Sequence, residues 1–159
     1  MATDQQLTEL CHQLLWGPFD VSPNAAELNI SPALDEQYFR LFLTDDLAAY
    51  CAYPIVEATF ARIAMNPAEH ETLRIRCTQY LLNCGSRILD SILLSMVFDD
   101  DEMLRRTALE GLYLHGSSQL LMAARYLQHD GDEEIRDLSA AILNDDDILL
   151  YDLDPPPFD

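Results

Sequence analysis

The sequence predicts an all-α protein built from stacked helical hairpins, and three observations lead to this prediction. The segment Glu71–Arg74 has the same pattern as Glu102–Arg105, 31 residues later. The apolar residues that follow each segment recur at the spacing of a helix. Gly85 and Gly116, also 31 residues apart, divide each copy in two, because glycine readily ends a helix in the left-handed conformation. Self-similarity at a fixed period of this length is typical of repeat proteins.

Each copy is expected to form two helices joined by a short turn. In the copy that begins at Glu102, Gly116 ends the first helix, and Ser117 or Ser118 caps the second. Ser86 is the corresponding cap in the preceding copy, and a third copy opens at Glu133. One hairpin cannot bury both of its apolar stripes, so neighbouring hairpins must stack. In the Glu102 copy the stripes comprise Leu104, Ala108, Leu109, Leu112, Tyr113, Leu120, Leu121, Ala124 and Leu127.

This pattern resembles the HEAT-like repeats, in particular the shorter variety found in bilin-lyase-type proteins. The resemblance covers roughly residues 70–147 and implies an α-α superhelix, that is, a solenoid. The architecture serves scaffolds, inhibitors, adaptors and a few enzymes, so it does not imply one function. The residues that carry the resemblance are the starts Glu71–Arg74, Asp101–Arg105 and Asp132–Arg136, the small residues Cys77, Ala108 and Ser139, and the glycines between helices.

One arginine recurs in each copy, at Arg74, Arg105 and Arg136. In the HEAT-like family such arginines usually pair with acidic groups of the adjacent turn and tie neighbouring copies together. The resemblance therefore implies a structural role for these three side chains, in preference to a ligand-binding one.

Residues 1–69 are interpreted as a divergent N-terminal half. Thr3 or Asp4 can cap a first helix that runs to about Trp16 and stops at Gly17. Residues 17–33 contain three prolines and are expected to form a loop over this helix. A tryptophan at a helix end is more often part of the core than a binding anchor, so Trp16 is expected to be buried.

The next helix is expected to begin at Ser31 and Pro32, a cap followed by a first-turn proline, and to end near Leu43. Thr44–Asp46 would then cap a further segment, which Pro54 either kinks or restarts as a new helix. Residues 40–70 are interpreted as a degenerate first repeat.

The chain is predicted to form a single domain over residues 1–159. It comprises the N-terminal helices of residues 1–69, the repeats of period 31 over residues 70–147, and a C-terminal segment over residues 148–159. That last segment is expected to contribute a short capping helix and an acidic, proline-rich, extended tail.

Charge is the most unusual property of the composition. There are 28 acidic residues against nine arginines and no lysine, so the formal net charge is −19. Such a chain repels nucleic acid and anionic membranes, and the expected partner is a basic protein. Four cysteines fall on apolar faces and are expected to be reduced. No secretory signal or membrane-length apolar run is visible, so a cytoplasmic location is expected.

The predicted partner-binding residues form an acidic ridge, because the turns before successive copies should line one edge of the stack. Capping and the helix dipole explain one or two acidic residues per turn, but not four. The spacing does not fit a calcium loop, so no metal or other cofactor is expected. The acidic ridge comprises Asp99, Asp100, Asp101, Glu102, Asp130, Asp132, Glu133 and Glu134.

A second candidate surface lies on the second helices of the hairpins. Its residues occupy positions that the stacking does not require, and they either contact a partner or are covered by the N-terminal segment. These residues are Leu94, Met122, Arg125 and Tyr126.

No nucleophile–base pattern, phosphate-binding loop or zinc spacing is visible, so the protein is predicted not to be an enzyme. The expected function is protein binding, as an inhibitor or immunity-type protein that covers a basic surface. The alternatives are a HEAT-like adaptor or maturation factor for complex assembly, and a DNA mimic. Neither the partner nor the oligomeric state follows from the sequence.

Overall fold

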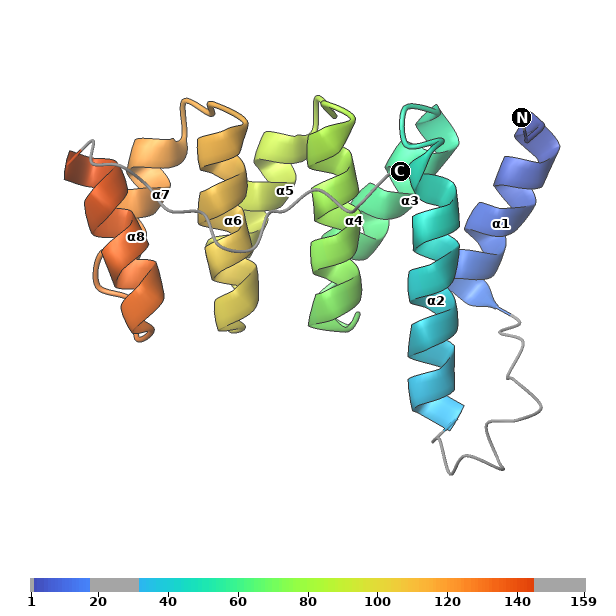
Figure 1. The fold of residues 1–159 in the computed structure, drawn as a ribbon, viewed down its shortest axis with the longest axis horizontal. Helices are drawn as coiled ribbons and strands as arrows, with labels where there is room; N and C mark the ends of the chain where they lie inside the picture. Colours follow the sequence, from blue (N-terminus) through green and yellow to red (C-terminus); the bar gives the residue numbers. More distant parts are fainter. Residues whose placement is uncertain (1, 18–31, 145–159) are drawn as a thin grey trace. The chain divides into compact units, whose positions relative to one another are not determined.

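A computed structural model describes residues 2–17 and 32–144, without the side chains of residues 32–35. In this part of the chain the helices are joined by turns and no strand is present, which confirms the predicted all-α class (Figure 1). The helices are α1 (Asp4–Trp16), α2 (Pro32–Ala48), α3 (Pro54–Ala64), α4 (Glu71–Asn83), α5 (Leu89–Met96), α6 (Glu102–Leu114), α7 (Leu120–Leu127) and α8 (Glu133–Asn144). No helix of the described residues is long and apolar enough to cross a membrane.

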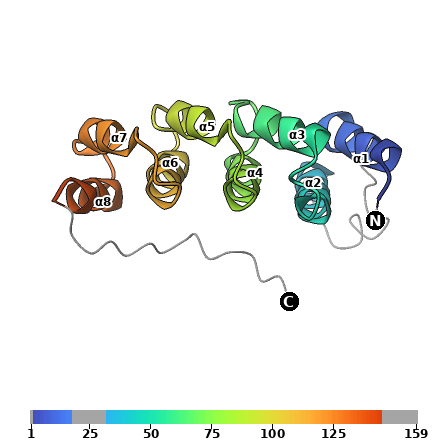
Figure 2. The same cartoon turned by 90° about the horizontal axis from the view of Figure 1, so that it is seen from above.

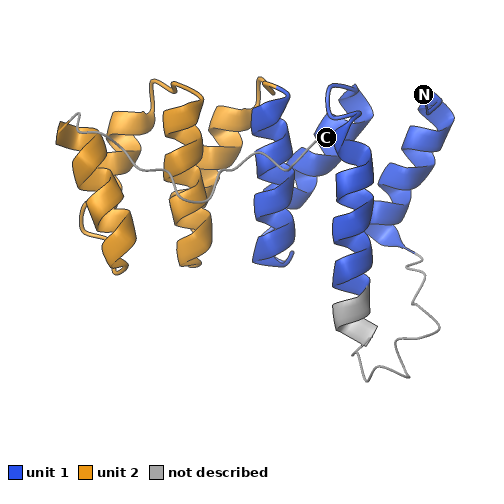
Figure 3. Ribbon diagram, in the orientation of Figure 1, with its two compact units in different colours: residues 1–84 blue, residues 85–159 orange. Residues whose placement is uncertain are grey.

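The chain divides into two compact units, which Figure 3 shows in different colours. Unit 1 comprises residues 1–84 and holds α1 to α4, whereas unit 2 comprises residues 85–159 and holds α5 to α8. The prediction of a single domain stays a prediction.

Unit 1 has two layers of helices, with α1 and α3 in one layer and α2 and α4 in the other (Figure 2). Helix α3 packs against both α1 and α4. The core between the layers includes Leu7, Leu47, Phe60 and Leu81, all fully buried. Phe60 also stacks on the ring of Tyr80, with 5.9 Å between ring centroids. Each helix therefore contributes at least one large apolar side chain to this core.

Unit 2 also has two layers, with α5 and α7 in one and α6 and α8 in the other (Figure 2). Leu93, Leu112 and Leu127 are buried, as the predicted stripes require. The side chain of Leu93 on α5 packs directly on Gly111 of α6, where a Cβ atom would lie 2.7 Å from Cδ2 of Leu93. Leu93 therefore occupies space that a side chain at residue 111 would need.

The helix boundaries recur with the period read from the sequence. Helices α4, α6 and α8 begin at residues 71, 102 and 133, and α5 and α7 begin at residues 89 and 120. Gly85 and Gly116 have φ angles of 66° and 65°, the left-handed conformation expected at these helix ends. The stacked superhelical arrangement itself stays a prediction.

The N-terminal helix agrees with its prediction at both ends. The Thr3 hydroxyl accepts from the backbone N–H of Gln6 and so caps α1, and the side-chain oxygen of Gln6 accepts from the backbone N–H of Thr3. Gly17 follows Trp16 with a φ angle of 73°. Pro54 starts the new helix α3, which is the second of the two alternatives. Most of the predicted 17–33 loop and the segment from residue 145 onward lie outside the described residues.

The predicted end of α2 is wrong. The helix continues past Leu43 to Ala48, so Thr44–Asp46 lie inside it and do not cap the next segment. Thr44 is buried, and its hydroxyl donates to the carbonyl of Arg40 at 2.7 Å, one turn earlier in the same helix. A threonine that satisfies its hydroxyl in this way does not need to end a helix.

Four side chains also differ from their predictions. Trp16 is 60% exposed instead of buried, and its ring lies 4.5 Å from the guanidinium carbon of Arg62. Tyr113 and Leu121, expected in the stripes, are exposed. Ser86 caps a turn that precedes α5, through a bond from Ile88 N–H, instead of capping α5 itself.

Candidate functional site

The turns before α6 and α8 have the same hydrogen-bonded framework. Asp99 Oδ1 accepts from the N–H of Asp101 at 3.1 Å, and Asp130 Oδ1 accepts from the N–H of Asp132 at 2.9 Å. Asp101 then caps α6 through Leu104 N–H at 3.1 Å, and Asp132 caps α8 through Ile135 N–H at 3.0 Å. Four of the ridge aspartates are therefore held by local hydrogen bonds.

In each case an arginine of the following helix donates hydrogen bonds to backbone carbonyls of the turn. Arg105 Nη1 donates to the carbonyls of Asp99 and Asp100, at 3.0 and 2.8 Å. Arg136 Nη1 donates in the same way to the carbonyls of Asp130 and Gly131, at 2.8 and 2.9 Å. These contacts are structural, because they hold the turn that precedes each helix. Arg74 is also structural, since it is buried and its Nε donates to the carbonyl of Ala64.

Arg105 also binds the next turn. Its Nε and Nη2 donate to the two carboxylate oxygens of Asp130, at 2.7 and 2.8 Å, which is the geometry of a two-pronged ion pair. The Arg105 bonds lower the pKa of Asp130, and the bond to Asp130 raises the pKa of Arg105. The Asp130 side chain is only 6% exposed, so this carboxylate is part of the structure and not of an open surface.

Arg106 forms a second bridge between helices of unit 2. Its Nε donates to Glu110, one turn later in α6, at 3.0 Å. Its Nη1 pairs with Glu134 of α8, whose side chain is 72% exposed. Glu134 is therefore accessible, but its charge is partly compensated by a residue of the same chain.

The acidic ridge is consequently narrower than predicted. Asp99, Asp101 and Asp132 serve the turns and are half-buried, and Asp130 serves the ion pair. In each turn two of the four acidic residues make local hydrogen bonds, which agrees with the one or two that capping was expected to explain. The ridge residues with exposed side chains are Asp100, Glu102, Glu133 and Glu134.

The second candidate surface contains an aromatic pair. Tyr126 on α7 packs edge to face on Phe98, which follows α5, with 4.7 Å between ring centroids, and both side chains are exposed. Met122, one turn before Tyr126, is exposed as well, and so is Arg125, whereas Leu94 is half-buried. Phe98 is absent from the predicted set, although an aromatic residue directly before an acidic run could have drawn attention to it.

Unit 1 contains a polar cluster that the sequence analysis missed. Arg40 donates to both carboxylate oxygens of Glu69, at 2.6 and 2.8 Å, and its Nε donates to the carbonyl of Leu14 at 3.1 Å. Both side chains are mostly buried. Tyr80 donates to Asp45 at 2.7 Å, and burial, together with this bond, raises the pKa of Tyr80 to about 12. These contacts hold α1, α2 and α4 together.

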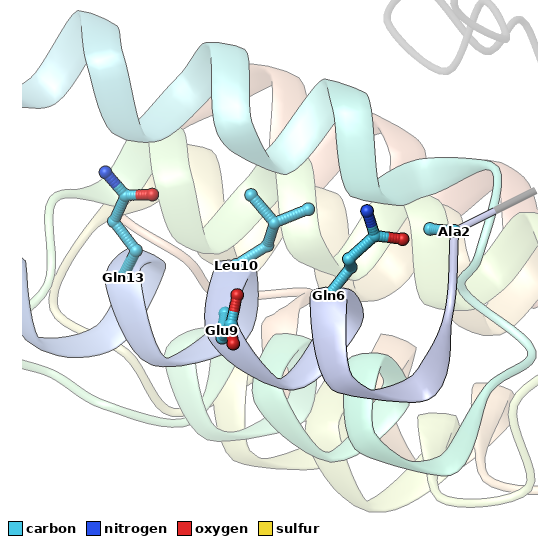
Figure 4. A pocket seen from close by; sticks show the side chains of 5 residues that line it. All are labelled: Ala2, Gln6, Glu9, Leu10 and Gln13. Atoms are coloured by element: carbon cyan, nitrogen blue, oxygen red, sulfur yellow. The ribbon is translucent and has the colours of Figure 1, made fainter.

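No group of three or more potential metal ligands occurs within residues 2–17 and 32–144. A shallow depression follows one face of α1, and Figure 4 shows the five side chains that line it. They comprise two amides, one carboxylate and two apolar groups, namely Gln6, Gln13, Glu9, Ala2 and Leu10. This lining does not pair a nucleophile with a base.

Comparison of the chain with protein-family models, with curated proteins and with solved structures found no match.

Proposed function

We propose that this chain is a non-enzymatic, cytoplasmic protein-binding module of the HEAT-like type, and that the acidic edge of unit 2 binds a basic surface of another protein. An inhibitor or immunity-type protein is the most specific form of this proposal. The observation that carries it is the repeated, hydrogen-bonded turn, which leaves Asp100, Glu102 and Glu133 exposed beside a fixed backbone.

Rigidity of the two turns supports a recognition role. Glu102 and Glu133 are the first residues of α6 and α8, and the caps Asp101 and Asp132 fix the backbone that carries them. A partner therefore meets carboxylates on a backbone that is already fixed, and less backbone conformational entropy is lost on binding. Their place at helix N-termini also stabilises the helices, but this effect acts whether or not a partner is present.

The distribution of positive charge also supports a basic partner. Arginines such as Arg40, Arg105 and Arg136 are engaged by carboxylates or carbonyls of their own chain. Acidic residues outnumber arginines by 28 to nine, so the formal net charge of the chain is −19. Complementary charge accelerates encounter with a basic protein and disfavours acidic competitors.

The aromatic pair gives unit 2 an apolar contact of its own. Phe98 directly precedes the first acidic turn, and the ring of Tyr126 packs against its ring. Binding sites commonly combine such aromatic groups with a charged rim. The proposed binding surface therefore comprises the exposed ridge carboxylates together with Phe98, Met122 and Tyr126.

The test uses a partner obtained by pull-down and identified by mass spectrometry, and it measures association rates at low and high salt. The variant Asp100→Asn with Glu133→Gln removes two exposed charges without touching the caps. We expect association about tenfold slower at low salt and a flatter salt dependence. The matched control is Asp4→Asn with Asp46→Asn, which removes two exposed charges from unit 1.

Equal slowing in the variant and in the control would mean that only net charge matters, and would contradict binding at this edge. An unchanged rate at both salt concentrations would also contradict it. In that case Tyr126→Ala tests the aromatic pair by itself.

A further inference from the structure

Two cysteines that are distant in the sequence face each other in unit 1. Cys51 lies in the turn after α2, and Cys84 is the C-cap residue of α4. Their Sγ atoms are 2.7 Å apart, although 33 residues separate them in the sequence. A disulfide bond is about 2.05 Å long, so the sulfur atoms need to move together by only about 0.7 Å to reach bonding distance.

We propose that Cys51 and Cys84 are a redox-active pair, which a low-molecular-weight disulfide oxidises to an intramolecular disulfide and which a thiol reduces again. The sequence analysis expected only reduced core cysteines, and the structure contains both residues as free thiols. The proposal concerns unit 1 and does not depend on the binding surface proposed for unit 2.

The backbone around the two cysteines is suited to a small adjustment. Cys51 lies between α2 and α3, where the chain is in turns and not within a helix. Cys84 ends α4 and precedes Gly85, whose φ angle is 66°. Neither sulfur therefore sits in the middle of a helix, where a shift of the backbone would break several hydrogen bonds.

The two thiols differ in accessibility, and this difference sets the order of the steps. Cys84 is partly exposed, whereas Cys51 is 3% exposed and its thiol donates to the carbonyl of Tyr80 at 3.3 Å. Burial raises the pKa of the Cys51 thiol, so this group stays protonated until the second step. Cys84 is consequently the sulfur that meets an oxidant first.

The reaction balances as two thiol–disulfide exchanges. The thiolate of Cys84 attacks one sulfur of the small disulfide, forms a mixed disulfide and releases one thiolate. Cys51 then gives its proton to that thiolate or to water and attacks Sγ of Cys84, which releases the second small thiol. Two protein thiols and one small disulfide thus become one protein disulfide and two small thiols.

The disulfide would link the end of α2 to the end of α4 and would enclose α3 in the loop. Closing a loop of this size restricts the unfolded chain and stabilises the folded state. Unit 1 would therefore resist heat better under oxidising conditions than under reducing ones.

The experiment incubates the folded protein with glutathione disulfide and follows it by intact-mass and non-reducing peptide mass spectrometry. We expect the wild-type chain to lose two hydrogen atoms and to yield a peptide that links Cys51 to Cys84. We also expect a melting temperature about 5–15 °C higher, which dithiothreitol reverses. A wild-type chain that stays fully reduced, keeps a glutathione adduct or forms intermolecular dimers would overturn the proposal.

Three variants make the assignment specific. Cys51→Ala should accumulate one glutathione adduct on Cys84, because the second step is blocked. Cys84→Ala should take up at least tenfold less glutathione, because Cys51 is buried. Cys11→Ala is the matched control and should oxidise as the wild type does, since Cys11 is buried elsewhere in unit 1. Equal glutathione uptake in the first two variants would contradict the proposed order of steps.

Discussion

Units 1 and 2 contain the same kind of ion pair at comparable places along the chain. In unit 1, Arg40 of α2 donates two hydrogen bonds to the carboxylate of Glu69, which lies just before α4. In unit 2, Arg105 of α6 donates two hydrogen bonds to the carboxylate of Asp130, which lies just before α8. Each pair thus ties one helix to the turn that begins the next helix in the same layer (Figure 2).

The two arginines differ in their remaining bonds. Arg40 donates to the carbonyl of Leu14, 26 residues away on α1. Arg105 donates instead to the carbonyls of Asp99 and Asp100, six and five residues before it. Unit 1 therefore uses its ion pair to join three helices, whereas unit 2 also uses the guanidinium to complete its own turn. The bonds of Arg105 to its own turn belong to a sequence pattern that recurs in the chain. The bond of Arg40 to Leu14 belongs to no such pattern.

The largest expected effect tests whether the two units are packed equally well. Leu81 and Leu112 are 31 residues apart, and both are fully buried. Leu81→Ala and Leu112→Ala should each reduce the free energy of unfolding by about 2–5 kcal/mol, because each leaves a cavity. Chemical denaturation measures both values. A loss below about 1 kcal/mol for either variant would show that its unit does not pack as described.

The second prediction compares the ion pairs directly. Arg40→Ala and Arg105→Ala should each cost about 3 kcal/mol, because a mostly buried carboxylate loses its partner. Arg125→Ala, which removes an exposed arginine, is the control and should cost less than about 0.5 kcal/mol. If denaturant curves show Arg40→Ala to be as harmless as this control, the unit 1 pair is not structural.

The third prediction concerns the loss of stability at low pH, to which the ion pair of Asp130 should contribute. Its pKa is lowered in the folded state, so the stabilisation is present above the unfolded pKa of about 3.9. It is lost as the pH falls below that value through the folded pKa. Asp130→Asn should therefore lose less stability than the wild type when the pH is lowered from 5 to 2.

Urea unfolding at several pH values measures this slope. Asp137→Asn removes an exposed carboxylate from α8 and should keep the wild-type slope. If stability falls with pH equally in Asp130→Asn and in the wild type, the charge of Asp130 does not stabilise the fold.

Helix capping gives a smaller difference between the units. Asp101→Ala should cost about 1 kcal/mol, because Leu104 N–H loses its acceptor. Asp101→Asn retains an acceptor and should be nearly neutral. At the corresponding place in unit 1, His70 accepts from Thr72 N–H at 3.3 Å, and His70→Ala should cost only a few tenths of a kcal/mol. Thermal unfolding of the three variants decides whether the caps rank in this order.

The smallest expected effect is that of metal. Four aspartates of the two unit 2 turns already accept bonds from N–H groups or from Arg105, namely Asp99, Asp101, Asp130 and Asp132. We therefore expect the melting temperature to stay the same within error when calcium or EDTA is added. A rise of several degrees at micromolar calcium would show that these turns hold an ion.

The regular half of the chain was the easier half to predict. The pattern around Arg105 recurs around Arg136, and the structure repeats the same bonds at both places. Arg40 and Glu69 belong to no such pattern, so their pairing could not be read from the sequence. The contact between Trp16 and Arg62 was missed for a similar reason, since it joins α1 to α3 and follows no repeated pattern.

The candidate site was predicted in position but not in detail. Acidic residues do gather in the turns before α6 and α8, as expected. Their division into buried and exposed groups depends on backbone conformation, because Asp99 and Asp130 turn back to bond their own chain. Composition alone cannot make that distinction.

The position of Trp16 has a spectroscopic consequence. It is the only tryptophan in the chain, and it lies at the end of α1 beside Arg62, in unit 1. Its fluorescence therefore reports the state of unit 1, whereas circular dichroism at 222 nm reports helices of both units. Coincident curves from the two probes would mean that both units unfold as one cooperative system. If the fluorescence change comes first, unit 1 opens while unit 2 keeps its helices.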